Sequence, residues 1–151
     1  MHLPRYPLRA SSDWLHYEFV SVGHRGQILK VVEYTYLPLL NFWNLGFGDF
    51  DESSGEISDT ITTDNGDARK VVATVAVTLL DFFAAYPEET VIFSGSDSVR
   101  TRAYQRAIVQ YATSFASVLK FSGLTEEGEE IPIETDRPYF AFLVKRKQPA
   151  V

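Results

Sequence analysis

The sequence predicts an α+β protein, in which an antiparallel sheet of about six to seven strands carries two long helices on one face as a two-layer sandwich. Three observations support this. Four strand-like segments follow one another before residue 63, joined by short turns, which favours an antiparallel meander. Two segments with helical spacing come next, with one strand between them. Two further strand-like segments follow the second helix.

The first half of the chain has the alternation and the turn residues of β-strands. Residues 15–22 alternate apolar and polar side chains, and a tight turn at 23–26 joins them to a strand at 27–37. Further strands are expected at 42–50, which contains two glycines, and at 56–62, which is rich in Ile and Thr.

The first helix is expected at 68–86. Asp64 or Asn65 is expected to cap it, and Asp67 favours the positive end of its dipole. Helical spacing places seven residues on one apolar stripe, namely Val72, Val75, Ala76, Leu79, Phe82, Phe83 and Tyr86.

The second half alternates between strand and helix. A short buried strand at 90–93 and a glycine turn precede a second helix at 98–121. Ala103 and Ala107 are expected to mark the core side of this helix, and Gly123 to serve as its C-cap. Residues 131–134 and 139–145 are expected to pair as a closing hairpin.

Length and composition limit the class of protein. With 151 residues, 45% of them hydrophobic and 23% charged, the chain matches a single globular domain. Residues 1–12 are expected to form an irregular arm and 146–151 an exposed tail. The lack of cysteine excludes disulfides, thiolate metal sites and a cysteine nucleophile. No apolar run approaches the ~20 residues that span a bilayer, so a cytoplasmic protein without a membrane partner is expected.

Four segments resemble a family of small bacterial proteins, associated with Bacteroidetes, that is catalogued as a domain of unknown function. They are FVSVGHRGQILKVVEY, NLGFGDFD, DNGDARKVVATVAVTLLDFF and VIFSGSDSVRTRAYQRAI. The resemblance spans residues 19 to about 119. It implies a compact standalone domain, with NGD at 65–67 and GS…RTR at 95–102 as hallmarks. It implies no activity.

The stretch GSDSVRTR is a candidate anion site, because a helix N-terminus exposes unpaired N–H groups and partial positive charge. Glycine allows close approach of a ligand, serines donate hydrogen bonds, and arginines suit phosphate or carboxylate. Helical geometry makes Arg100 and Tyr104 the better ligand candidates, with Arg102 next. The expected site residues here are Gly95, Ser96, Ser98, Arg100, Arg102 and Tyr104.

The same turn also has a purely structural interpretation. Ser96 or Asp97 would cap the helix, and the arginines would pair with carboxylates such as Asp64 or Asp67. The stretch lacks both the GK[ST] of a Walker loop and the G-x-G-x-x-G of a dinucleotide site.

A second group of residues would join this site if the two helices pack side by side. The start of the first helix would then bring Asn65, Asp67 and Lys70 to the same rim.

No catalytic residue, resident metal or cofactor is predicted. The histidines form no H-x-x-x-H or H-E-x-x-H pattern, and the acidic loops lack calcium-loop spacing. No G-x-S-x-G elbow is present, which gives a serine hydrolase little support. Aromatic residues such as Tyr34 and Trp43 could stack a base, but packing between sheet and helix is the stronger interpretation.

Two functions from different classes follow. The first is a small binding protein that recognises a partner protein, such as a toxin or a defence component, or a second copy of itself. The second is a protein or enzyme that binds a nucleotide or another phosphate-bearing small molecule at 95–104. The net charge of −6 disfavours general nucleic-acid binding.

Overall fold

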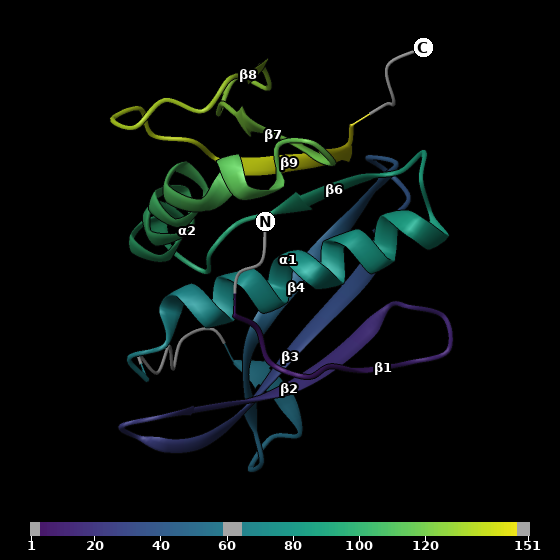
Figure 1. Cartoon of the computed structure of the whole chain (residues 1–151). Coiled ribbons are helices and arrows are strands. Elements are labelled where there is room, and N and C mark those ends of the chain that lie inside the picture. The colour runs from purple at the N-terminus through teal and green to yellow at the C-terminus, as the bar shows by residue number, and fades with distance from the viewer. Residues whose placement is uncertain (1–3, 59–64, 148–151) are drawn as a thin grey trace. The chain divides into compact units, whose positions relative to one another are not determined.

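The computed structural model describes residues 4–58 and 65–147 (Figure 1). It confirms the α+β class, with two α-helices and a mostly antiparallel sheet of nine strands, more than the six to seven expected. The strands follow the order β1-β2-β3-β4-β6-β9-β7-β8, and β5 pairs with β4. One neighbouring pair departs from the antiparallel expectation, because β4 and β6 run parallel.

The helices and strands have the following bounds. The helices are α1 Ala68–Ala85 and α2 Ser98–Tyr111, and a 3₁₀ helix follows at Ala112–Phe115. The strands are β1 Arg9–Ala10, β2 His16–Gly23, β3 Gly26–Leu37, β4 Phe42–Asp51, β5 Glu56–Ser58, β6 Thr90–Phe93, β7 Leu119–Leu124, β8 Glu130–Ile131 and β9 Ala141–Arg146.

The chain forms two compact units. The first comprises Met1–Thr35 and Leu45–Ala85, and the second comprises Tyr36–Asn44 and Tyr86–Val151. The long strands β3 and β4 contribute residues to both units. The first unit holds α1, and the second holds α2, β6, β7, β8 and β9.

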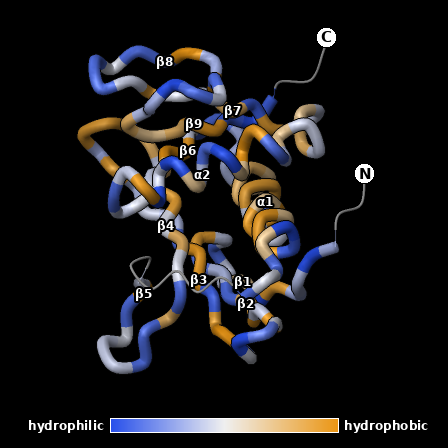
Figure 2. The backbone as a smooth tube through the Cα atoms, turned by 90° about the vertical axis from the view of Figure 1, so that its left-hand side faces the viewer, coloured by the Kyte–Doolittle hydropathy of each residue, from blue (hydrophilic) through white to orange (hydrophobic). Residues whose placement is uncertain are grey.

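In the first unit, α1 packs on the inner face of the β2–β3 hairpin. The ring of Phe82 stacks on that of Tyr34, with the centroids 4.5 Å apart. The Tyr34 hydroxyl lies 2.8 Å from the Thr78 hydroxyl, so this buried polar group is satisfied. Figure 2 shows α1 as a largely hydrophobic helix.

The buried face of α1 differs in part from the expected stripe. Ala76, Leu79, Phe82 and Phe83 are buried as predicted, but Val72 and Val75 are only half-buried. The buried residues are Ala73, Thr74, Ala76, Thr78, Leu79, Phe82 and Phe83. The two threonines can be buried because their hydroxyls bond to carbonyl oxygens of their own helix, at 2.7 Å each.

In the second unit, the two faces of β6 and β9 carry different cores. Phe93 contacts Tyr104 of α2 edge-on, with the centroids 6.1 Å apart, and it also packs on Phe142. Successive strand residues point to opposite faces, so Ile92 and Leu143 lie on the other side. There they form a second cluster with Ala141, against which Leu37, Phe42 and Leu124 pack.

The prediction of a helix over 98–121 is wrong beyond Tyr111. Leu119 begins β7, which pairs with β9, so these residues gain ladder hydrogen bonds in place of a helical turn. Gly123 is a strand residue and not a C-cap. A Cβ atom there would lie 2.4 Å from the ring of Tyr139, so glycine makes room for that ring.

The prediction of which side of α2 faces the core is also wrong. Ala103 is exposed, and the buried residues of the helix are Thr101 and Gln105. These two polar residues lie four apart on one face and bond to backbone groups of neighbouring segments, which removes the penalty of burying them.

The predicted closing hairpin is wrong in its pairing. β8 pairs with β7, and β9 lies between β6 and β7. Two prolines, Pro132 and Pro138, fall in the segment that was expected to extend this hairpin. Proline lacks the N–H group that a ladder needs.

The chain ends are more ordered than expected within the described residues. The arm contains β1, which pairs with β2, and Tyr6 is buried within the first unit. At the other end, β9 continues to Arg146. The expected strand at 56–62 is observed as far as Ser58. Its remaining residues, together with Asp64, lie outside the described residues.

Candidate functional site

Asn65, the first residue of the NGD segment, fastens the β2–β3 turn. Its side-chain oxygen accepts a hydrogen bond from the Arg25 N–H at 2.7 Å, and its amide nitrogen donates to the Gly26 carbonyl at 2.9 Å. A Cβ atom on Gly23 would lie 1.9 Å from the Asn65 carbonyl oxygen, so glycine permits this close approach. The amide therefore binds the hairpin and not the helix that it was expected to cap.

Asp67 lies in a polar cluster with residues of the arm and of β2. One carboxylate oxygen accepts hydrogen bonds from the hydroxyls of Tyr6 and Ser21, each at 2.5 Å. Burial raises the pKa of Asp67, but these two hydrogen bonds and the charge of Lys30 outweigh it. The pKa of the carboxyl is therefore held below its ordinary value.

Two lysines of the first unit also make polar contacts near Tyr6 and Asp67. The Lys70 ammonium lies 4.2 Å from the centre of the Tyr6 ring, a cation–π contact. Lys30 and Asp49 form a buried ion pair, and the charge of Lys30 also acts on Asp67. Asn65, Asp67 and Lys70 thus all make contacts inside the first unit.

The start of α2 is capped by a carboxylate. Asp97 is the N-cap, and one of its oxygens accepts a hydrogen bond from the Arg100 N–H at 2.9 Å. Its other oxygen pairs with the Arg100 guanidinium at 2.5 Å. The backbone hydrogen bond and the Arg100 charge lower the pKa of Asp97. A negative group of the protein thus occupies the position at which an incoming anion was expected.

Gly95 makes room for the helix itself. A Cβ atom there would lie 2.5 Å from both the Arg100 Cβ and the Thr101 nitrogen. The Gly95 N–H donates to the Thr101 hydroxyl at 3.0 Å, and that hydroxyl donates to the Asp97 carbonyl at 2.9 Å. The first turn of α2 therefore fills the space that the glycine leaves.

The other expected residues of this turn differ in their surroundings. Ser96 and Ser98 are exposed, and Tyr104 is half-buried against Phe93. The Arg102 guanidinium lies 3.5 Å from the Arg137 carbonyl oxygen. The 95–104 residues belong to the second unit, whereas Asn65, Asp67 and Lys70 belong to the first. Anion binding by these residues stays a prediction.

A turn in the first unit, residues 11–16, presents an exposed tryptophan that the sequence reasoning missed. Trp14 is 44% exposed and has φ of 63°, in the left-handed region that a bulky residue rarely adopts. The Trp14 N–H donates to the Ser11 carbonyl at 3.1 Å, and the Ser11 N–H to the His16 carbonyl at 2.9 Å. The signal available in the sequence was the polar run SSD directly before the tryptophan.

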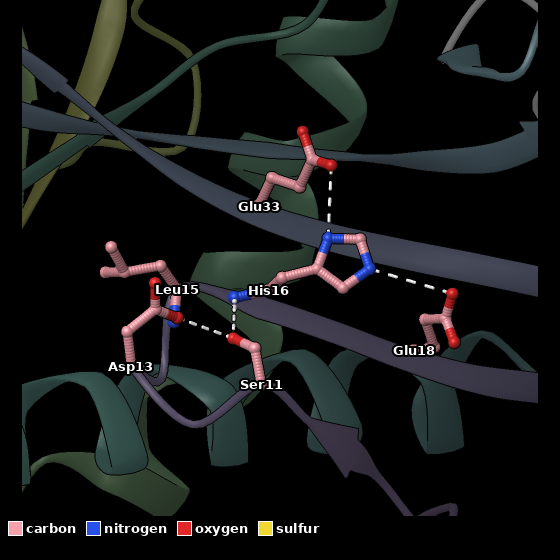
Figure 3. A network of polar contacts seen from close by, with 6 residues as sticks. All are labelled: Ser11, Asp13, Leu15, His16, Glu18 and Glu33. Atoms are coloured by element: carbon pink, nitrogen blue, oxygen red, sulfur yellow. Dashed lines mark hydrogen bonds and ion pairs between the residues drawn. The ribbon is translucent and has the colours of Figure 1, made fainter.

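Side chains hold this turn from both ends (Figure 3). Asp13 accepts hydrogen bonds from the Ser11 hydroxyl at 2.6 Å and the Leu15 N–H at 3.1 Å, and these lower its pKa. The His16 ring lies between two carboxylates, 3.1 Å from Glu33 and 3.6 Å from Glu18. The conformation of Trp14 is thus fixed by its neighbours.

A basic hollow in the second unit is the other feature that sequence reasoning missed. It has a volume of about 360 Å³ and lies at the starts of β6 and β7 and the end of β9. Four of its eight lining residues are cations, namely Lys120, Lys145, Arg146 and Lys147. The sequence places three of these in the run KRK and the fourth 25 residues earlier, so only the strand pairing brings them together.

Comparison with protein families assigns the chain. The model of a family of unknown function, DUF6934, matches residues 2–147. The chain belongs to DUF6934. This confirms the expected resemblance to a domain of unknown function, and the DUF6934 match covers both units. No curated protein and no solved structure matches the chain.

No helix among residues 4–58 and 65–147 is long and apolar enough to cross a bilayer. The same part of this DUF6934 chain contains no group of three His, Asp or Glu side chains placed to hold a metal ion.

Proposed function

We propose that the chain is a binding protein that docks a partner protein on the turn at 11–16. The backbone of Trp14 carries this proposal. A left-handed conformation costs a residue with a Cβ atom roughly 1–2 kcal/mol. The indole stays 44% exposed, so a large part of its surface is left for a partner to cover. Strain of this kind that the surroundings enforce is a recurrent property of binding sites.

The rigidity of the turn supports a docking role. The hydrogen bonds of Ser11 and Asp13 and the contact of the His16 ring with Glu33 fix the backbone of the turn before a partner arrives. A turn whose backbone is already ordered loses less conformational entropy on binding, so more of the contact energy appears as affinity. Tryptophan is also among the residues that most often dominate protein interfaces.

The expected partner is a protein with an apolar pocket for the indole. Full burial of a large apolar side chain contributes about 1.5–3 kcal/mol, and a partner would bury the 44% of Trp14 that is still exposed. Products of neighbouring genes, toxins and defence proteins among them, are the first candidates, and a second copy of the chain is another.

Fluorine NMR tests the proposal directly. The chain has two tryptophans, so protein labelled with 5-fluorotryptophan gives two ¹⁹F signals, and the Trp14→Phe variant assigns them. Addition of a neighbouring-gene product should shift or broaden the Trp14 signal and leave that of Trp43 unchanged. A concentration series of the protein alone tests self-association in the same way.

A matched variant separates the Trp14 turn from another exposed apolar turn. Leu39 is fully exposed at the turn between β3 and β4, in the second unit. Trp14→Ser should weaken binding of the partner at least tenfold, and Leu39→Ser should leave it unchanged. Equal binding by Trp14→Ser and the parent protein would refute the proposal.

A further inference from the structure

The basic hollow of the second unit contains two lysines that face each other across a strand pair. Lys120 of β7 and Lys145 of β9 are direct partners in the antiparallel register, and Thr90 of β6 is the partner of Lys145 on the other side. Directly paired residues place their side chains on the same face. The three side chains therefore form one row across three strands.

Two like charges directly opposite each other destabilise a sheet. The protein offsets this repulsion in part with Glu130, whose carboxylate oxygens lie 3.3 and 3.5 Å from the Lys145 ammonium. A hydrogen bond from Ser122 lowers the pKa of Glu130 most, and the charges of Lys145 and Lys120 lower it further. The field of both lysines thus acts on one carboxylate of the protein, on the same face of the sheet.

Further cations surround this pair at the strand ends. Arg146 and Lys147 follow Lys145 directly and line the same hollow, and both are exposed. Glu88 and Glu89 are the acidic residues of the lining, and Glu130 pairs with Lys145, so four cations stand against three carboxylates and a net charge of +1 remains. The chain as a whole carries −6, so this is a local reversal of its charge.

We propose that this hollow binds a small molecule that bears a phosphate or diphosphate group. Its volume of about 360 Å³ lies within the range of small-molecule sites, roughly 300–1,000 Å³. Ammonium and guanidinium groups are the side chains that recognise phosphate. A bound anion would remove the repulsion between Lys120 and Lys145, so binding and the stability of the sheet are coupled. The site does not depend on the Trp14 turn.

The test uses the full chain and pyrophosphate as the probe. Isothermal titration calorimetry should show binding, and saturating pyrophosphate should raise the melting temperature. Sodium chloride at matched ionic strength should raise it less, because screening weakens the repulsion between the lysines but adds no specific contact. Lys120→Gln should weaken the affinity at least tenfold. The same variant should melt at the same temperature as the parent protein or higher when no ligand is present, since it relieves the repulsion.

Two control variants test where on the protein pyrophosphate binds. Arg106→Gln removes an exposed cation of α2 that does not line the hollow and should change nothing. Arg102→Gln tests the start of α2. Loss of pyrophosphate binding in Arg102→Gln, with full binding in Lys120→Gln, would overturn the proposal and favour the helix start. Absence of binding in the parent protein, or an equal effect of sodium chloride, would also overturn it.

A last experiment distinguishes a phosphate ligand from a carboxylate ligand. A hexaglutamate peptide carries carboxylates in place of phosphates. Tighter binding of the peptide than of pyrophosphate at the Lys120 site would overturn the small-molecule assignment in favour of an acidic protein segment. Weaker binding of the peptide would support the assignment.

Discussion

The side-chain amide of Gln105 donates a hydrogen bond to the Arg137 carbonyl at 2.8 Å, across 32 residues of the chain. The same nitrogen lies 2.7 Å from the Glu134 carbonyl oxygen and 3.3 Å from that of Thr135. One buried side chain of α2 therefore contacts three carbonyl groups of the segment between β8 and β9.

Replacement of Gln105 should destabilise the protein strongly. Gln105→Ala would remove three hydrogen bonds and leave a cavity where the buried side chain stood, which should lower the free energy of unfolding by about 2–4 kcal/mol. Gln110→Ala, at an exposed position of the same helix, is the control and should cost less than about 0.5 kcal/mol. Urea denaturation measures both. Equal effects of the two changes would contradict the role assigned to Gln105.

Gly95 should be intolerant of any side chain even without a ligand. In Gly95→Ala the new Cβ would meet backbone and side-chain atoms of α2 at 2.5 Å, so a loss of more than about 2 kcal/mol is expected. Gly55→Ala is the comparison, because no atom lies within 4 Å there but φ is +72°. That change should cost about 1 kcal/mol. A tolerated Gly95→Ala would show that the glycine does not serve helix packing.

The Asp67 cluster should make the protein less stable in acid. The folded-state pKa of Asp67 is lowered, so its contribution is complete above the unfolded value of 3.8 and is lost as pH falls through the folded pKa. Asp67→Asn should therefore be less stable than the parent protein at pH 7, by about 1–3 kcal/mol. The difference should shrink below pH 4. A difference that stays constant between pH 7 and pH 3 would show that the charge of Asp67 is not involved.

Asp81 should have the opposite effect. Burial on α1 raises its pKa and outweighs the opposing charge of Arg5, so the charged form is disfavoured in the folded state. A raised folded-state pKa gives stability that is complete below the unfolded value and is lost as pH rises through the folded pKa. Asp81→Asn should thus raise the melting temperature at pH 7 by about 1–3 °C and change it little at pH 3. Glu126→Gln, an exposed carboxylate, is the control for a general charge effect.

The sequence predicted elements whose pattern is local. The β2–β3 hairpin and α1 were found because alternation, turn residues and helical spacing are visible within a dozen residues. The end of α2 was missed because the apolar period of the helix continues into β7, and only pairing with β9 decides the structure of residues 119–124. Strand pairings at long sequence separation leave no local pattern.

The candidate sites show the same limit. Sequence reasoning selected Gly95, Arg100 and Asn65, whose residue types are typical of ligand sites and also of turns and caps. The contacts of these residues lie largely within the protein. The basic hollow and the Trp14 turn were not predicted from the sequence. The hollow depends on the register that pairs Lys120 with Lys145. The turn depends on the positive φ of Trp14, which the identity of the residue does not predict.

The position of β9 has a consequence for the order of folding during synthesis. β6 and β7 have no direct pairing, because β9 lies between them. A ribosome releases residues 90–93 and 119–124 well before residues 141–146. Until then Phe93 lacks its packing partner Phe142, and β6 and β7 each lack the strand that pairs with them. The nascent second unit should therefore be a target for chaperones, whereas the β2–β3 hairpin and α1 can assemble as soon as residue 85 has left the exit tunnel.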